Sequence, residues 1–371
     1  MNKSIHIISF DIPYPANYGG VIDVFYRIKA LHACGIHVIL HNFQYGDRVQ
    51  SEELKKYCKK IYYYQRKKWS FSLTTPYIVV SRNDNNLLNN LLQDEAPILF
   101  EAVHSSLLIN HPKLKDRIKI VRMHNIEHDY YASLAKPENN LFKKTYYLVE
   151  SFLLKNYEKR LISANYLLAI SPKDERYLKT KFGNKVKLLP AFHGNSEVNI
   201  EPGESNYCFY HGKLSVAENN LAALFLVREV FSNIPFKLLI AGDGASIELK
   251  KEVSKHEHII LLTSLKSEEI TTYIKKAHVN ILPTFQSTGI KLKLINVLFN
   301  GKFVLVNSPM VAETGLSEAT IIADTPDKMK EKIAELFKLE FDWNAIQHRK
   351  AILSEKFNNQ LNIQKLISLL D

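Results

Sequence analysis

The feature that most constrains this chain is an alternation of short apolar segments with amphipathic helical ones, which continues along the whole sequence. Apolar runs such as IHIISF (5–10) and HVILHNF (37–43) have the length and composition of β-strands. Between them, residues 21–33 carry apolar side chains at helical spacing. Strands that alternate with helices in this way form parallel sheets with helices on both faces. The sequence therefore predicts an α/β fold.

The alternation runs twice, with a break in the middle. Expected strands lie at 98–103, 119–125, 166–171 and 185–191 in the first half, and at 206–212, 236–242, 258–263 and 279–284 in the second. The segment 192–206 contains glycine and proline without a clear period, which is typical of a linker. We therefore expect two Rossmann-like, doubly wound domains, residues 1–192 and 193–371, that face a ligand cleft at the C-terminal ends of their strands. The last helix, at about 347–370, is expected to pack back across the cleft.

A length of 371 residues suits two domains. The chain has no window near the roughly 18 unbroken apolar residues of a membrane span. Its N-terminus leads directly into a strand, so we expect no signal peptide. The three cysteines, Cys34, Cys58 and Cys208, lack metal-ligand spacing, which favours reduced thiols in the cytoplasm.

The net charge of +11 is concentrated in residues 1–192, which hold 29 basic and 17 acidic side chains. The densest run, Lys55 to Trp69, contains seven basic and five aromatic residues and no acid. The stretch Lys55–Lys68 could bind an anionic membrane surface or another polyanion, or it could be an ordinary solvated face. The chain carries no standard nucleic-acid recognition motif, so we expect no nucleic-acid partner.

The first strand is followed by DIPYPANYGGVID, in which Gly19 and Gly20 open a helix. Backbone N–H groups at such a helix N-terminus can approach an anion closely. The alternative is a simple glycine turn. No dinucleotide-binding G-x-G-x-x-G pattern is present here or in IAGDGAS (240–246).

The segment RMHNIEHDYY, residues 122–131, places His124 at the C-terminal end of a strand, where α/β proteins hold their ligands. His124 and His128 are four residues apart, which leaves a metal site open as an interpretation. A structural histidine is a second interpretation, and a substrate-contacting histidine is the one that we favour over both.

Two lysines stand where a phosphate could bind. Lys213 follows a strand and a glycine in YHGKLS, although an isolated lysine is more often a surface residue. Lys291 opens the apolar helix of STGIKLKLINVLFNG (287–301), where the positive end of the helix dipole disfavours a cation. A bound anion would remove this conflict, whereas the alternative is that Lys291 and Lys293 extend to solvent.

Five segments together resemble the retaining glycosyltransferases of the GT-B fold, over nearly the whole chain. They are P-x-x-x-G-G at 15–20, RMHNIEHDYY, the helix and strand at 150–178, YHGKLSVAENNLAALFLVREVF at 210–231, and GIKLKLINVLFNGKFVLV at 289–306.

The resemblance implies a nucleotide-sugar donor, no cofactor, no metal, and diphosphate charge neutralised by protein groups. It implies that His124 contacts the donor sugar near the reacting carbon. The residues expected at the donor are Gly19, Gly20, Lys213, Thr288, Gly289, Lys291 and Asn296. No acceptor-binding residues are assigned.

The chain departs from the family pattern at three positions. Thr288 and Asn296 stand where the family commonly has two glutamates, the second of which holds the ribose. Asn296 can still form hydrogen bonds to a diol, without charge assistance. Glu218 stands before Asn219, where a second basic residue is usual.

We therefore expect a metal-independent hexosyltransferase of the cytoplasm, peripheral at the inner face of the cell membrane, that builds cell-surface polysaccharide on a glycan or lipid-linked acceptor. A catalytically weakened partner subunit or glycan-binding scaffold is the alternative, favoured by Glu218 and Asn296. A nucleotide-sugar epimerase of similar fold is a third hypothesis, but the sequence lacks the carboxylates that would activate its water.

Overall fold

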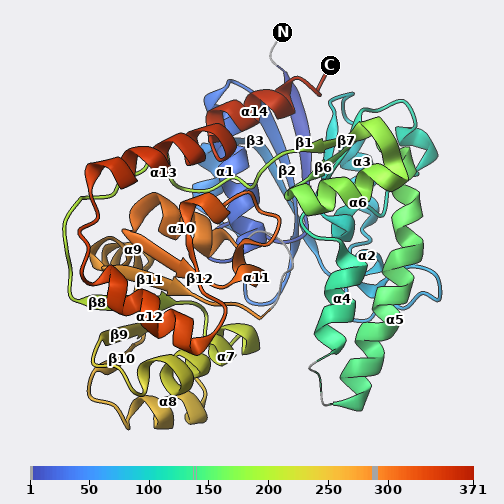
Figure 1. Ribbon diagram of the computed structural model, residues 1–371. Coiled ribbons are helices and arrows are strands. Elements are labelled where there is room, and N and C mark those ends of the chain that lie inside the picture. The colour runs from blue at the N-terminus through green and yellow to red at the C-terminus, as the bar shows by residue number, and fades with distance from the viewer. Residues whose placement is uncertain (1–2, 137, 139, 286–290) are drawn as a thin grey trace. The chain divides into compact units, whose positions relative to one another are not determined.

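The computed structural model describes residues 3–136, 138, 140–285 and 291–371. The chain divides into two compact units. Unit 1 comprises Met1–Gly194 and Asn359–Asp371, and unit 2 comprises Asn195–Asn358. Each unit is a parallel sheet with helices packed on it (Figure 1). The prediction of two Rossmann-like α/β domains is confirmed.

The sheet of unit 1 has seven strands in the order β3-β2-β1-β4-β5-β6-β7, all paired in parallel. The strands are β1 (Ser4–Ser9), β2 (His37–Gln44), β3 (Cys58–Gln65), β4 (Ile98–Glu101), β5 (Lys119–Met123), β6 (Tyr166–Ala169) and β7 (Val186–Leu188). The strand order reverses between β1 and β4. Ligands of doubly wound sheets bind at the carboxyl ends of the strands beside such a reversal.

Helices cover both faces of this sheet, and each face has its own apolar core. The helices are α1 (Gly19–Ala33), α2 (Tyr77–Val80), α3 (Asn85–Leu91), α4 (Glu127–Ala135), α5 (Leu141–Tyr157), α6 (Pro172–Phe182) and α14 (Asn359–Ile367). Helices α4 and α5 run alongside one another (Figure 1). Ile363 and Leu366 of α14 are buried in the same core as Val24 and Ile28 of α1.

Unit 2 has six parallel strands in the order β10-β9-β8-β11-β12-β13. They are β8 (Tyr207–His211), β9 (Lys237–Ala241), β10 (Ile259–Leu262), β11 (Val279–Leu282), β12 (Phe303–Val306) and β13 (Ile321–Ile322). Its helices are α7 (Ala217–Phe225), α8 (Ile247–Val253), α9 (Ser267–Lys276), α10 (Leu292–Asn300), α11 (Ser308–Val311), α12 (Pro326–Leu336) and α13 (Trp343–Lys356). A π-helical segment, Leu226–Phe231, continues α7.

The structure adds a strand that was not expected and divides one expected helix into two. The basic run at 55–69 contains a strand, β3, at the edge of the sheet. The single helix expected at 347–370 is two helices, because α13 ends at Lys356 and α14 begins at Asn359. The side-chain amide of Asn359 donates to the His193 carbonyl (2.7 Å), an interaction that competes with helix continuation.

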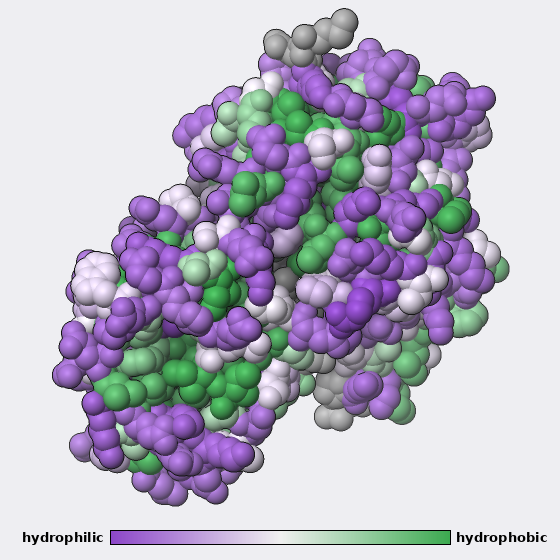
Figure 2. Space-filling model, turned by 45° about the horizontal axis from the view of Figure 1, so that its top comes forward, coloured by the Kyte–Doolittle hydropathy of each residue, from purple (hydrophilic) through white to green (hydrophobic). Residues whose placement is uncertain are grey.

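Within the described part of the chain, no helix is both long and apolar enough to span a bilayer. On the face drawn in Figure 2, polar residues cover most of the surface, and apolar side chains form smaller groups between them.

Candidate active site

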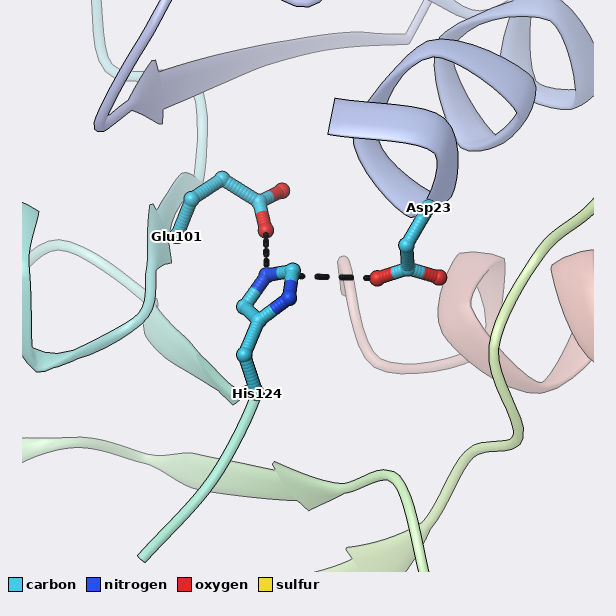
Figure 3. A group of neighbouring side chains, drawn as sticks. All are labelled: Asp23, Glu101 and His124. Carbon is cyan, nitrogen blue, oxygen red and sulfur yellow. Dashed lines mark hydrogen bonds and ion pairs between the residues drawn. The ribbon is translucent and has the colours of Figure 1, made fainter. Parts of the chain in front are cut away.

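His124 lies just after β5, at the carboxyl edge of the unit 1 sheet, with two acids beside its ring (Figure 3). Its Nε2 is 2.9 Å from Glu101 Oε2, at the end of β4, and 3.9 Å from Asp23 Oδ2, on α1. Both acids are buried. Because a carboxylate accepts a hydrogen bond, this contact places the ring proton on Nε2. Nδ1 is then the nitrogen that can accept a hydrogen bond from a substrate.

Two arginines hold these acids in place. Arg27 donates to Asp23 (2.8 Å) and to Glu101, and it is fully buried. Arg122 contacts both oxygens of Asp23 (3.1 and 3.2 Å) and donates to the carbonyls of Leu189 and Pro190. Although burial alone would raise the pKa of Asp23, Arg122 and Arg27 hold it well below its ordinary value. The cluster therefore carries two positive and two negative charges around His124.

Asp23, Glu101 and His124 each offer a ligand atom, and these atoms lie within 4.8 Å of one another. A metal ion would have to displace existing bonds, because guanidinium groups or His124 already contact both oxygens of each acid. The backbone N–H of Phe192 also donates to Asp23 (2.7 Å). The cluster is thus an ion-pair network that orients the histidine, and it fits a metal poorly. His128, the other residue of the metal interpretation, lies 3.3 Å from Glu158 instead.

Gly19 and Gly20 open α1, as the sequence predicts, but their surroundings differ. A Cβ at Gly20 would lie 2.6 Å from the ring of Phe10, whereas a Cβ at Gly19 would meet nothing within 4 Å. The ring of Phe10 packs edge-on against His124, with 5.3 Å between centroids. Gly20 therefore allows the helix to approach the ring that supports His124, while Gly19 borders open space.

In unit 2, Lys291 is the N-cap residue of α10, and its partner is Glu218 in the first turn of α7. Lys291 Nζ lies 3.2 and 3.5 Å from the two carboxylate oxygens of Glu218. The hydroxyl of Thr284 also donates to Glu218. Glu218, which departs from the family pattern, thus neutralises Lys291, which was expected to bind phosphate.

Lys293 is held next to this pair. Its Nζ donates to Asn219 Oδ1 (3.0 Å) and lies 5.3 Å from the ring centre of Tyr210. Burial lowers the pKa of Lys293 to about 8. The amide of Asn219 donates in turn to the backbone carbonyl of Lys213, whose own side chain is exposed. Hydrogen bonds thus link Lys213, Asn219 and Lys293, and Glu218, which precedes Asn219 in the sequence, pairs with Lys291.

The loops after β8 and β9 pack closely against one another at the carboxyl edge of the unit 2 sheet. A Cβ at Gly242 would lie 1.9 Å from the carbonyl oxygen of Gly212, and Gly242 has a φ of +156°. The N–H of Ser215 donates to the Asp243 carbonyl (3.0 Å). The IAGDGAS segment therefore braces the loop that carries Lys213, a structural reason for its glycines.

Asn296 lies on α10, where its side-chain oxygen accepts a hydrogen bond from the Asn300 amide (3.1 Å). Thr288 and Gly289 lie outside the described residues.

The sequence analysis did not identify four residues of the His124 cluster, namely Asp23, Arg27, Glu101 and Arg122. Two of them, Glu101 in ILFEAV and Arg122 in KIVRMHN, could have been found from the sequence, because each is a charged residue inside an apolar strand and a buried charge requires a partner.

No protein-family model matches the chain. A curated relative, an uncharacterized 44.6 kDa protein in the cps region of Klebsiella pneumoniae, is 29% identical over an alignment of 341 residues that covers 86% of this chain and 87% of that protein.

Among solved structures, the Staphylococcus aureus TarM G117R mutant, in complex with Fondaparinux, alpha-GlcNAc-glycerol and UDP, has a TM-score of 0.67 at 12% identity over 100% of both chains. A UDP-forming alpha,alpha-trehalose-phosphate synthase from Burkholderia xenovorans, in complex with glucose-6-phosphate, has a TM-score of 0.64 at 12% identity, also over 100% of both. A glycosyltransferase from Rickettsia africae has a TM-score of 0.64 at 13% identity, over 100% of this chain and 98% of its own. The chain therefore has the GT-B fold.

Proposed function

We propose that the protein is a glycosyltransferase that moves a sugar from a nucleotide-diphosphate donor to a glycan or lipid-linked acceptor. A fold hosts many functions, so the site must carry the argument. The observation that carries it is His124, oriented by Glu101 at the carboxyl edge of the sheet with one ring nitrogen left for a substrate. The GT-B likeness and the relative in a cps region support a role in cell-surface polysaccharide synthesis.

In this proposal, His124 Nδ1 accepts a hydrogen bond from a hydroxyl of the donor sugar. The buried acids and arginines fix the ring, so little reorganisation is needed as the sugar reacts. Retention of the anomeric configuration is part of the proposal and rests on the family resemblance alone.

The donor diphosphate would lie against Gly19, Gly20, Lys213 and Lys291, with Thr288 and Gly289 in the adjoining loop and Asn296 near the ribose. The first turn of α1 has no side-chain cap and no acidic residue, which leaves its N–H groups suited to an anion. Lysines and N–H groups can stabilise the leaving diphosphate without a metal ion. The proposed reaction is therefore metal-independent.

We also place the protein at the inner face of the cell membrane, through the C-terminal end of the basic run and the loop that follows it. Lys55 and Lys56 pair with Glu52 and Glu53, so that part of the run is largely neutralised. The loop that follows exposes Trp69 (95%), Phe71 (85%) and Leu73 (80%) after Lys67 and Lys68.

Helix α5 continues this apolar surface. Its exposed apolar side chains are Leu141, Phe142, Tyr146, Leu148, Val149 and Phe152. Tyr77 links loop and helix, because its N–H donates to Glu150 of α5 (2.9 Å) and its hydroxyl donates to the Lys68 carbonyl (3.0 Å). Exposed aromatic residues beside lysines favour an anionic bilayer surface.

Calorimetry with UDP, GDP, ADP, CDP and dTDP tests the proposal. We expect one of them to bind, and we expect Lys291→Ala to weaken that binding at least about tenfold by removing a cation from the phosphate. Lys255→Ala is the matched control, since Lys255 is also paired with a glutamate in unit 2. Absence of binding to all five would contradict a transferase and favour the second candidate, a partner subunit whose phosphate site Glu218 has neutralised.

A further inference from the structure

Unit 1 holds two arginines that have no acidic partner among the residues that the structure describes. Arg66 follows β3, and Arg82 follows α2. The side chain of Arg66 donates through Nε to Ser81 Oγ (3.0 Å), and the N–H of Lys67 donates to the Ser81 carbonyl (2.8 Å). These bonds hold Arg66 against the residue that precedes Arg82.

Arg82 is 5% exposed, so its charge needs compensation. Its Nε donates to the Phe10 carbonyl (3.0 Å) and its Nη1 to the Ile78 carbonyl. Within the described chain, its Nη2 makes no hydrogen bond. Burial lowers the pKa of Arg82 to about 9, and the charge of Arg66 contributes, yet the guanidinium stays protonated at neutral pH.

The nearby acids do not neutralise these arginines. Asp11 is within electrostatic range of Arg82, but it accepts a hydrogen bond from Tyr18 (2.7 Å) and lies 3.6 Å from Arg48. Glu150 is within range of Arg66, but it accepts the Tyr77 N–H.

Glu127 is the third acid in this region, and it is 3% exposed. Its Oε1 is buried without a hydrogen-bond partner, and its Oε2 lies 3.9 Å from His104. Burial raises the pKa of Glu127 to about 8. Within the described chain this carboxyl group forms no ion pair with Arg66 or Arg82, so it does not neutralise the two arginines.

The arginine pair lies next to the candidate catalytic residue. Phe10, whose carbonyl Arg82 contacts, packs against His104 (5.5 Å between centroids) and against His124 (5.3 Å). Arg66 stacks on the rings of Tyr45 (4.5 Å) and Tyr77 (5.1 Å), which fixes its plane. Stacked, planar guanidinium groups are well suited to oxyanions, which they bind through paired hydrogen bonds.

We propose that Arg66 and Arg82 bind a phosphate or carboxylate group of the acceptor, so that the acceptor is an anionic sugar or glycan. The assignment of this anion to the acceptor rests on the proposed transferase function. The anion site itself rests on the two arginines and their surroundings in unit 1.

Three probes that share a glucose ring test this inference by calorimetry on the full chain: methyl α-glucoside, glucuronic acid and glucose 6-phosphate. We expect at least one anionic probe to bind, and the neutral one to bind at least about tenfold more weakly. Which anionic probe binds identifies the group as carboxylate or phosphate. Arg82→Gln and Arg66→Gln should each weaken that binding about tenfold or more, and Arg66→Lys should restore part of it.

The matched control is Arg228→Gln, because Arg228 is an exposed arginine of unit 2 paired with Glu248 and Glu252. Thermal unfolding verifies that each variant is folded. Arg66 is less buried than Arg82, so Arg66→Gln is expected to fold and can test the inference even if Arg82→Gln does not fold. Equal binding of all three probes, no binding of either anionic probe, or unchanged binding in a folded Arg66→Gln variant would overturn the inference. Binding of nucleoside diphosphates is measured on the same preparation, so that failure here is distinguishable from failure of the transferase proposal.

Discussion

The ammonium group of Lys291 lies 3.2 Å from a carboxylate oxygen of Glu218, so the chain itself supplies the anion that the position of this lysine requires. A bound diphosphate would have to share Lys291 with that carboxylate. Like charges at such short range repel, and the repulsion is large where water is partly excluded.

Glu218→Gln should therefore increase the affinity for the preferred nucleoside diphosphate about tenfold, because it removes a competing negative charge. Glutamine keeps an oxygen that can accept the Thr284 hydrogen bond. Calorimetry at low salt measures the change. A fall in affinity would mean that Glu218 positions Lys291 for the donor instead of competing with it.

The two glycines at the start of α1 should respond differently to alanine. Gly20→Ala forces a methyl group against Phe10 and should lower the free energy of unfolding by about 1–3 kcal/mol. Gly19→Ala meets no atoms and should keep or raise stability by up to about 1 kcal/mol. If Gly19 contacts the diphosphate, this variant should nevertheless bind the nucleotide more weakly. Thermal unfolding and calorimetry on the pair separate the two effects, and unchanged nucleotide binding by Gly19→Ala would remove it from the donor site.

His124→Ala should reduce the slow hydrolysis of the preferred nucleotide sugar about a hundredfold, since a positioned polar group near the reacting carbon contributes on that order. Release of nucleoside diphosphate without acceptor measures this rate. His348→Ala, at an exposed position of α13, is the control. A His124→Ala enzyme that folds and retains a near-normal rate would refute the role.

Glu127 should make stability depend on pH. Its pKa is raised to about 8 in the folded chain, so its contribution is fully present below the ordinary value of 4.5 and is lost as the pH rises through 8. Glu127→Gln removes the ionisation. We expect the variant and the natural chain to unfold at similar temperatures at pH 5, and the variant to be the more stable at pH 9. A constant difference across this range would mean that Glu127 is ionised in the fold.

The apolar surface of the 67–73 loop can be tested with its own tryptophan. Trp69 and Trp343 are the two tryptophans of the chain, so Trp343→Phe leaves Trp69 as the reporter. Its emission should shift to shorter wavelength with phosphatidylglycerol vesicles, and Trp69→Ser with Phe71→Ser should reduce co-sedimentation severalfold. Trp343→Ser is the matched exposed control. Self-association through this surface, seen as a dimer by ultracentrifugation without vesicle binding, would contradict the membrane assignment.

Asn296→Glu should preserve or raise donor affinity if the side chain faces the ribose, because glutamate can also accept the Asn300 hydrogen bond. Calorimetry with the preferred nucleoside diphosphate measures it. Loss of folding in this variant would show that Asn296 is a packing residue.

Much of the fold could be predicted because its signal is local. Apolar runs such as 5–10 and 37–43 form neighbouring strands, and the helix expected at 21–33 begins two residues earlier, at Gly19. The edge strand β3 was missed since its side chains are largely basic and aromatic, as an edge strand tolerates. The break between α13 and α14 depends on the contact of Asn359 with His193, which lies far away in sequence.

The site was predictable in part for the same reason. His124 and Lys291 could be selected by their positions at element ends, but their partners come from other elements. Glu101 and Glu218 are separated from them by 23 and 73 residues, and only the fold brings them together. Lys291 has an anionic partner, as its place at the start of a helix predicts, but that partner is the Glu218 carboxylate, and phosphate binding by Lys291 stays a prediction.

The return of residues 359–371 to unit 1 has a consequence for synthesis on the ribosome. Ile363 and Leu366 complete the apolar core beside α1, yet they are made only after the whole of unit 2. Unit 1 therefore stays unfinished while most of the chain emerges, with an apolar face exposed to aggregation. A nonsense codon between Gly194 and Ile363 would leave that face permanently uncovered, so we expect even a product truncated shortly before Ile363 to be degraded by the proteases of the cell.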